Sequence, residues 1–342
     1  METSRKTTID DVALKAGVST FTVSQALRGR AGVAAATRER VQTVAKQMGY
    51  QVNSAASLMA QRKTQKNQRR LLIGHLFENH FESPFRAGCD AHGWEGKDFC
   101  VSDFSSPAVA SRILWQQGVD GLIIAGGGAF VHPFWKSVME FRWDRFSVVK
   151  IARALPELRF NLVRHSAFDY MMMTLRKTVA SGCRRMAIVL LESRSESDDL
   201  ERLGALLAFK EKMLPPAVHC EWRISGSTPI TNRLLDAATL LWLKEYSPDA
   251  IVVYHWSMLY QLIEEGFGIP ETTSITAVLN TTEHYEGLPV ISGCDLSISS
   301  LYNRALEILE GQIGRGERGF VNHPAEYIIE PEWVEGETLR TR

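Results

Sequence analysis

The stretch TIDDVALKAGVSTFTVSQAL, residues 8–27, has the pattern of two short helices joined by a tight turn. Thr8 can cap the first helix, whose apolar residues recur at helical spacing. Gly17 then breaks the helix, and Ser19 is a good N-cap for a second helix over residues 20–28. This order of cap, helix, glycine turn and capped helix predicts a helix-turn-helix.

A third helix is expected over residues 35–48, and the three helices make a small all-α domain over residues 1–52. The segment QVNSAASLMAQRKTQKNQRR follows, with few apolar residues and a basic end. Asn53 could cap one short helix over residues 54–61, which is too short to be stable alone in water. We therefore expect residues 53–70 to form a linker that needs a partner to order it.

The charge of the chain is divided unevenly along its length. Residues 1–70 contain 13 Lys and Arg against four Asp and Glu, whereas the whole 342-residue chain has no net charge. A basic head on an acidic body favours a polyanion as the partner of the head. From charge alone, a basic surface that only keeps the head in solution remains an alternative.

Cysteine usage and hydropathy favour the cytoplasm. The five cysteines are odd in number and widely scattered, which argues against a disulfide framework. The first residues, METSRKTTIDDV, have no apolar core for a signal peptide, and no apolar run approaches the ~20 residues of a membrane span. We therefore expect a cytoplasmic protein.

From residue 71 onward, short apolar runs alternate with helical stretches. The strand-like runs are LLIGHLF, VDGLIIAG, FSVVKIA, RRMAIVLL, DAIVVYH, SITAVL and PVISG. The helices are expected at 168–181, 200–213, 233–246, 257–266 and 297–311. This alternation predicts parallel α/β sheets, and the segment is long for one sheet. We therefore expect two doubly wound lobes, at about 71–160 plus 291–323 and at about 161–290 plus 324–342.

The outer face of the second helix carries residues that suit DNA. A helix N-terminus offers its N–H groups and its dipole to a phosphate. Exposed side chains on such a helix can reach base edges, thymine methyl groups or phosphates, and here they would be Thr20, Phe21, Ser24, Gln25 and Arg28. A generic helical bundle is the alternative for the helix-turn-helix alone, and the basic excess of the segment favours DNA.

Two segments, TTIDDVALKAGVSTFTVSQAL and TRERVQTVAKQMGYQVN, resemble the DNA-binding head of LacI-type, or lactose-repressor-like, transcriptional regulators. In the body, VDGLII, GCRRMAIVLL, RLGALLAF, PDAIVVYHW and GFGIPETTSITAV are similar to the family's pattern and follow in its order. The resemblance implies a helix-turn-helix head on an α/β two-lobed, periplasmic-binding-protein-like body. It makes residues 53–70 a hinge helix and linker, and residues 71–342 the effector-binding and dimerisation domain.

The resemblance also implies roles for the DNA-facing positions. It places Thr20, Phe21 and Gln25 at base-reading positions of the recognition helix. A Leu of the family's hinge helix wedges into the minor groove, and Met59 stands at that position here. The other implied contacts, mostly to phosphates, are at Thr8, Ser19, Thr22, Ser24, Arg28, Thr37, Arg38, Tyr50, Asn53 and Ala56.

Three departures from the family pattern affect DNA recognition. Gln25 replaces a common Arg, and because Gln pairs with adenine where Arg prefers guanine, we expect an unusual half-site. Ala34 stands where a Ser usually caps the third helix, a loss of about 1 kcal/mol. Val52 replaces a Pro and makes the linker less rigid.

For the body, the resemblance implies an effector, which we expect to be a sugar or a related metabolite, in the cleft between the lobes. Arg202 and Asp295 match family residues that contact effector hydroxyls, and a surface salt bridge is the alternative for each. Trp256 could stack on a sugar or lie in the core. The expected effector-binding residues are Phe85, Ser166, Arg202, His255, Trp256 and Asp295.

Other kinds of chemistry lack their motifs in this sequence. AGGGA at residues 125–129 lacks the spacing of a phosphate-binding loop, and no G-x-S-x-G elbow is present. Cys89 and His92 are three apart, but no second pair supports a metal site. We therefore expect no catalytic residue, no metal and no cofactor.

The sequence predicts a transcription regulator that acts as a repressor and binds a near-palindromic operator as a homodimer, which leaves a tetramer open. Closure of the cleft around the effector would bias the hinge helix at residues 53–61. A sugar-processing α/β enzyme with a DNA-binding head is one alternative, and turnover of a sugar by residues 71–342 would favour it. A pure sugar-binding module is another, and specific operator binding would eliminate it.

Overall fold

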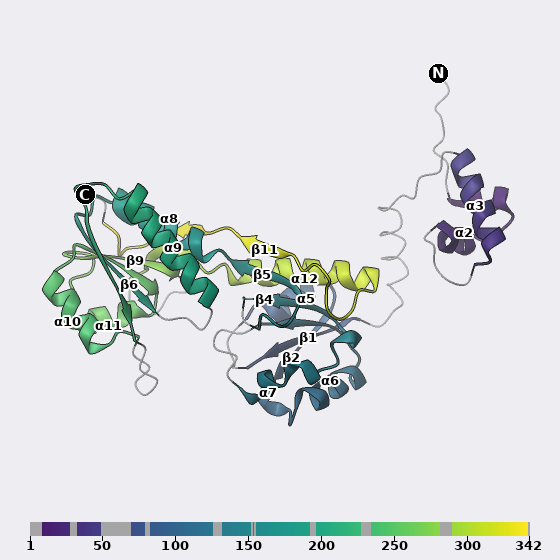
Figure 1. Ribbon diagram of the computed structural model, residues 1–342, viewed down its shortest axis with the longest axis horizontal. Coiled ribbons are helices and arrows are strands. Elements are labelled where there is room, and N and C mark those ends of the chain that lie inside the picture. The colour runs from purple at the N-terminus through teal and green to yellow at the C-terminus, as the bar shows by residue number, and fades with distance from the viewer. Residues whose placement is uncertain are drawn as a thin grey trace, which may run out of the picture. The chain divides into compact units, whose positions relative to one another are not determined.

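The computed structural model describes residues 9–27, 33–48, 70–78, 83–125, 132–151, 153, 155–191, 196–226, 234–280 and 289–340. The chain divides into two compact units, a head at residues 1–69 and a body at residues 70–342 (Figure 1). None of the helices in the described ranges is long and apolar enough to cross a membrane.

The head contains three helices around a small apolar core, α1 (Ile9–Ala16), α2 (Thr20–Leu27) and α3 (Ala35–Gln47). Its buried side chains are Val12, Ala13, Ala16, Val23, Ala26, Val41 and Ala45. Gly17 makes the turn between α1 and α2 at φ +64°, a left-handed conformation that favours glycine. The head therefore confirms the predicted all-α helix-turn-helix.

The first lobe of the body is built on a six-stranded parallel sheet in the order β11-β5-β4-β3-β1-β2. The strands are β1 (Leu72–Phe77), β2 (Glu95–Cys100), β3 (Val119–Ile124), β4 (Ser147–Ile151), β5 (Asn161–His165) and β11 (Glu326–Ile329). Its helices are α5 (Phe85–Ala91), α6 (Pro107–Gln116), α7 (Pro133–Lys136) and α12 (Ile298–Arg315), with short 3-10 turns at Val101–Asp103, Val138–Glu140 and Trp143–Arg145. One apolar cluster joins the sheet to α5 and α12, and another joins it to α6 and α7.

The second lobe is built on a six-stranded sheet in the order β12-β10-β9-β8-β6-β7, in which only the β10–β12 pair is antiparallel among the described pairs. The strands are β6 (Arg185–Leu191), β7 (His219–Ser225), β8 (Ala250–His255), β9 (Ser274–Asn280), β10 (Ser292–Asp295) and β12 (Glu332–Val334). Helices α8 (Ala167–Ala180) and α9 (Glu196–Lys212) cover one face, and α10 (Ala237–Tyr246) and α11 (Met258–Glu264) cover the other (Figure 1). Both lobes are thus doubly wound, as the alternating pattern predicts.

The chain crosses between the lobes after β5, after β10 and after β11. The predicted lobe limits are therefore wrong at three strands, because β5 and β11 belong to the first sheet and β10 to the second. A short apolar strand has the same appearance in either sheet, and pairing decides its place: β5 pairs with β4 and β11, and β10 pairs with β9 and β12. These crossings bring residues from both lobes to one region of the body.

Candidate nucleic-acid interface and ligand site

The start of α2 has the geometry expected of a recognition helix. Ser19 caps the helix, since its Oγ accepts a hydrogen bond from the Thr22 backbone nitrogen at 3.1 Å and lies 2.9 Å from Thr22 Oγ1. Ser19 and Thr20 are exposed, Gln25 is half-buried, and Val23 faces the core. The predicted cap is confirmed, and the polar start of the helix is accessible to a partner.

The third helix begins without a side-chain cap. Ala34 is its N-cap residue and makes no side-chain hydrogen bond, so the cap is missing as predicted. Thr37 and Arg38 lie in the first turns of this helix and are half-buried. Phe21 and Ser24 lie within α2. The remaining DNA-facing predictions fall outside the described residues, at Thr8, Arg28, Tyr50, Asn53, Ala56 and Met59.

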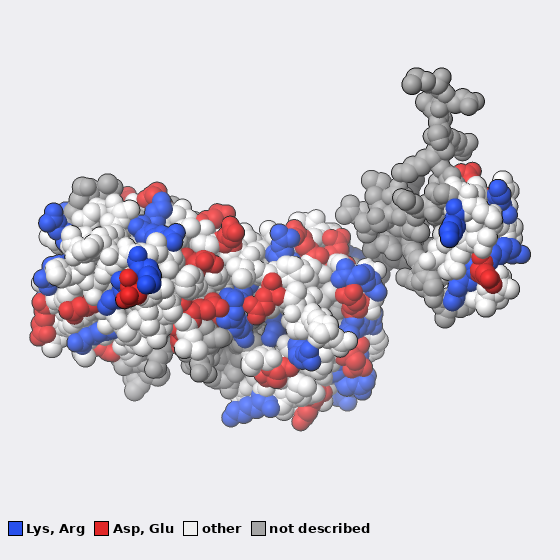
Figure 2. All heavy atoms as spheres, turned by 45° about the horizontal axis from the view of Figure 1, so that its top comes forward, with Lys and Arg blue, Asp and Glu red and all other residues white. Residues whose placement is uncertain are grey.

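The described part of the head exposes several basic side chains. Lys15, Arg40 and Lys46 are exposed, as is the acidic Glu39 next to Arg40, and Asp10 and Asp11 lie in α1. On the face visible in Figure 2, Lys and Arg side chains cover more of the head than Asp and Glu do. Such a surface attracts a polyanion by charge, whatever its sequence.

In the body, a cavity of about 120 Å³ lies between the two lobes. Its wall is formed by Ile151, Arg153, Arg164, His165 and Leu301 of the first lobe and by Ala167, Tyr170, Asp198, Arg202, Tyr254, Val278 and Leu279 of the second. It sits where the chain crosses from β5 into α8. The cavity therefore combines an apolar wall with charged and hydrogen-bonding groups, as small-molecule sites do.

Arg202, on α9, is the predicted effector residue that lines this cavity. It is 3% exposed, donates from Nη1 to Tyr254 Oη at 2.7 Å, and its guanidinium carbon lies 4.4 Å from the centre of the Tyr254 ring. It also pairs with Asp199 on the same helix. These contacts fix the guanidinium at the cavity wall.

Two further groups at the cavity wall are His165 and Tyr170, whose Nε2 and Oη atoms are buried. His165 interacts with the Leu296 backbone and Tyr170 with the Ser297 side chain. Burial lowers the pKa of His165 to about 4 and raises the pKa of Tyr170, so both are neutral near pH 7. A neutral imidazole and a neutral phenol can exchange hydrogen bonds with hydroxyl groups. The sequence offered no motif for either residue.

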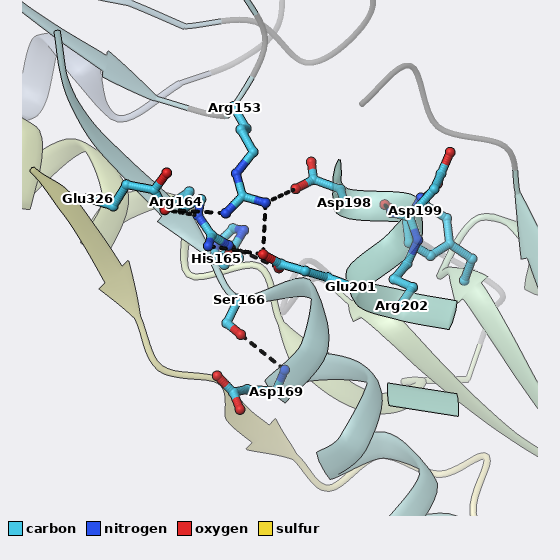
Figure 3. Close-up of polar contacts among 11 residues, drawn as sticks. Arg153, Arg164, His165, Ser166, Asp169, Asp198, Asp199, Glu201, Arg202 and Glu326 are labelled. Atoms are coloured by element: carbon cyan, nitrogen blue, oxygen red, sulfur yellow. Dashed lines mark hydrogen bonds and ion pairs between the residues drawn. The ribbon is translucent and has the colours of Figure 1, made fainter. Parts of the chain in front are cut away.

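A network of ion pairs adjoins the cavity (Figure 3). Arg164 donates from Nη1 and Nη2 to the two carboxylate oxygens of Glu201, each at 3.1 Å, and Arg153 Nη1 donates to Glu201 Oε1 at 2.7 Å. Glu326 Oε2 accepts from Arg164 Nε at 2.9 Å and from Arg153 Nη2 at 3.2 Å. Asp198 lies 3.7 Å from Arg153 Nη1. Two guanidiniums and two carboxylates thus alternate around one centre.

The two carboxylates of this network are held in their ionised form. Burial alone would raise the pKa of Glu201, but the hydrogen bonds and charges of Arg153 and Arg164 outweigh it and lower that pKa. The same balance lowers the pKa of Glu326. Both acids are therefore charged near neutral pH.

The other five predicted effector residues are described, and they do not line this cavity. Phe85 is fully buried, with its ring centre 4.9 Å from that of His75. Ser166 caps α8 by accepting from the Asp169 backbone nitrogen at 3.1 Å. The remaining three make these contacts: Asp295 accepts from Ser297 Oγ at 3.2 Å, His255 Nδ1 lies 2.7 Å from Ser257 Oγ, and Trp256 packs near Tyr260. Core packing and capping account for Phe85 and Ser166.

No cluster of His, Cys, Asp and Glu within the described ranges could hold a metal ion. The polar groups that the cavity offers are instead those of arginine, histidine, tyrosine and aspartate. Such groups suit an organic ligand with several hydroxyls.

A helix-turn-helix head on a two-lobed, periplasmic-binding-protein-like body, with a polar cavity between the lobes, defines a DNA-binding transcription regulator. Residues 8–53 match the family model "Bacterial regulatory proteins, lacI family". The head of the chain therefore matches the DNA-binding domain of this family, and the curated relatives of the chain are transcription regulators.

The chain is similar over most of its length to known regulators. It is 28% identical over 271 residues to the maltose regulon regulatory protein MalI of Escherichia coli (strain K12), which covers 75% of this chain and 73% of that protein. Its fold is similar to the Lac repressor dimer bound to operator and the anti-inducer ONPF, with a TM-score of 0.55, 20% identity, and coverage of 98% of this chain and 100% of that one.

A second solved structure with this fold is a LacI family transcriptional regulator from Arthrobacter sp. FB24 in complex with lactose. The TM-score is 0.58 and the identity 15%, with coverage of 79% of this chain and 100% of that one. Both structural likenesses confirm the predicted fold class.

Proposed function

We propose that this protein is a repressor that binds a near-palindromic operator as a homodimer in the cytoplasm and responds to a carbohydrate effector held between its lobes. The observation that carries the DNA-binding part is the capped, exposed start of α2 in a basic helix-turn-helix. A second copy is needed because one recognition helix per subunit contacts one half-site.

The base-reading residues of this proposal are Thr20, Phe21 and Gln25 on α2. Gln25 would form paired hydrogen bonds with adenine, and the hydrophobic ring of Phe21 would suit a thymine methyl group. Ser19 and Thr22 would hold phosphates at the start of the helix, where its dipole favours an anion. The operator half-site would therefore contain an A·T pair at the position opposite Gln25.

The carbohydrate part of the proposal rests on the groups at the cavity wall. Arg202 and Asp198 can hold neighbouring hydroxyls with charge-assisted hydrogen bonds, and His165 Nε2 and Tyr170 Oη can satisfy others. The regulator from Arthrobacter sp. FB24, which has the same fold, was solved with lactose. A polyhydroxyl ligand would supply further hydrogen-bond partners to these buried polar groups.

The DNA-binding part can be tested by selecting duplexes from a random library with the full chain. We expect a near-palindromic site with an A·T pair in each half, bound by two copies of the chain as measured by sedimentation. A selected site with no internal symmetry, or a complex with one copy of the chain, would contradict the proposal.

The carbohydrate part can be tested by thermal unfolding with a panel of mono- and disaccharides. A sugar at 100 times its dissociation constant stabilises the folded chain by about 2.7 kcal/mol. The shift should disappear in Arg202→Met and persist in Arg223→Met, a control at an exposed arginine on β7 that does not line the cavity. If no sugar stabilises the wild-type chain, or if both variants respond alike, the carbohydrate site is elsewhere or the ligand is of another class.

A further inference from the structure

We propose that Glu201 is the positioning residue that holds the two lobes closed over the cavity. It does so by pairing, from the second lobe, with Arg153 and Arg164 of the first lobe, and we call these three residues the inter-lobe clasp. The claim that the clasp controls effector binding rests on the proposed function. The claim that it holds the lobes closed rests on the ion-pair geometry alone.

The clasp connects parts of the chain that belong to different sheets. Arg153 follows β4 and Arg164 lies in β5, both in the first lobe, whereas Glu201 lies on α9 of the second lobe (Figure 3). Three hydrogen bonds of 2.7 to 3.1 Å join the one carboxylate to the two guanidiniums. A bidentate arginine pair of this kind fixes orientation as well as distance.

Glu326 provides a contrast within the same network. It accepts from the same two arginines, but it lies on β11, in the same sheet as β5, so its bonds do not cross between the lobes. Glu201 and Glu326 are both glutamates that bind the same two arginines, but they lie in different lobes. Neutralising each one in turn therefore separates an effect on lobe closure from an effect of lost charge.

The clasp is placed to hold the lobes because Arg164 is buried and Arg153 is largely covered. Without the Glu201 charge, the two guanidiniums would be left with the Glu326 carboxylate and, for Arg153, with Asp198 at 3.7 Å. This loss of charge pairing in a poorly solvated place disfavours the closed arrangement. Opening the lobes would let water solvate the guanidiniums. The equilibrium between closed and open lobes should therefore shift toward open in Glu201→Gln.

The clasp also bears on the cavity, since Arg153 and Arg164 line its wall. A ligand held there contacts residues of both lobes, so its binding depends on how far apart the lobes lie. If the closed form is the binding-competent one, the apparent affinity falls in proportion to the fraction of closed protein. Glu201→Gln should therefore weaken effector binding about tenfold or more, while Glu326→Gln changes it little.

The test measures the distance between the lobes in the full chain, with no effector and no DNA. Fluorescent labels go on Arg112→Cys in α6 and Glu245→Cys in α10, both exposed, in a Cys220→Ser background, because the other four cysteines are buried. Energy transfer between the labels is then compared for three proteins: the labelled protein with no further change, Glu201→Gln and Glu326→Gln. The measurement is made at about 50 mM NaCl, where charge screening is modest.

We expect a longer distance between the labels in Glu201→Gln than in the other two proteins. Arg153→Gln provides a second variant that breaks the clasp from the first lobe, and the double variant with Glu201→Gln should open no further than the single ones, because each removes a shared interaction. Equal distances in Glu201→Gln and Glu326→Gln, or additive opening in the double variant, would overturn the proposal.

The outcomes also separate this inference from the proposed function. If Glu201→Gln opens the lobes but no saccharide stabilises the wild-type chain, the clasp stands and the carbohydrate proposal fails. If saccharides bind the wild-type chain and Glu201→Gln with equal affinity and the label distance is unchanged, the clasp fails and the carbohydrate proposal stands.

Discussion

The head and the body of this protein place functional residues in opposite ways. In the head, the residues of α2 that we propose to face DNA are neighbours in sequence, and one cap and one helical period fix which of them face outward. In the body, the cavity wall runs from Ile151 to Leu301 and is assembled by chain crossings between two sheets. A local site can be predicted from spacing, whereas an assembled one requires the topology.

The two regions also use charge differently. On the visible face, the head exposes more Lys and Arg than Asp and Glu, which suits long-range attraction to DNA (Figure 2). The body holds Arg164 and Glu201 in a short, largely covered ion pair, which suits a fixed geometry (Figure 3). Changes in the head should therefore act on DNA affinity, and changes at the cavity should act on lobe closure and ligand binding.

The largest effect that separates the two regions should come from removing residues 51–64. We expect specific operator binding to fall by about a thousandfold or more, toward the level of non-specific binding, because the predicted hinge helix and its minor-groove contact are removed. Fluorescence anisotropy with a selected operator measures this. The body should still unfold at its original temperature, and an unchanged operator affinity would refute the hinge role.

A second prediction concerns how the stability of the body depends on pH. Burial lowers the pKa of His165 to about 4 from an ordinary value of 6.5, so between these pH values the unfolded chain binds a proton that the folded chain does not. The free energy of unfolding therefore rises with pH across this window and falls on acidification, by about 3 kcal/mol for this group.

His165→Asn should reduce the slope of this pH dependence, to which His75 and His255 also contribute, and His219→Asn, at an exposed histidine on β7, should not. Urea unfolding followed by tryptophan fluorescence measures it in the full chain, because residues 1–69 contain no tryptophan and the signal reports the body alone. Identical slopes in His165→Asn and wild type between about pH 4 and 6.5 would contradict the burial argument.

A third prediction concerns base recognition in the head. Gln25→Ala should weaken operator binding by about 2 kcal/mol and relax the preference at one base pair in each half-site. Gln47→Ala, at an exposed position near the end of α3, is the matched control and should leave the preference unchanged. Uniform weakening over all sequences would mean that Gln25 contacts no base.

The smallest effects should come from the helix caps. Ser19→Ala removes a cap and should destabilise the head by about 1 kcal/mol, whereas Ala34→Ser supplies a missing one and should stabilise it by a similar amount. Hydrogen exchange of the amides of α2 and α3 in the full chain should change about fivefold in opposite directions. Changes of the same sign would show that the caps do not limit head stability.

How well the fold could be predicted from the sequence depends on whether a strand is recognisable from its own residues or only from its place in the sheet. The largely apolar strands β1, β3, β6 and β8 were predictable because buried parallel strands are nearly continuous hydrophobic runs. The edge strands β2 and β7, EGKDFC and HCEWRIS, were not, because half of their side chains face water. β5 was also missed, since its sequence NLVRH carries polar residues at both ends.

The same contrast holds for the sites. In the head, the Ser19 cap and the missing cap at Ala34 were both predictable from sequence. At the cavity, Arg202 was found through the resemblance to a family, but His165 and Tyr170 had no sequence signal. Their role depends on β5 lying in the first sheet while α8 lies in the second, which no local pattern reveals.

The most direct test of the central claim is the affinity of the full chain for its selected operator relative to a scrambled duplex of the same length and composition, at about 0.15 M salt. Because base recognition is the only difference between the two duplexes, a sequence-specific regulator should prefer the operator by about a thousandfold or more. Equal affinities for the two duplexes would contradict the account.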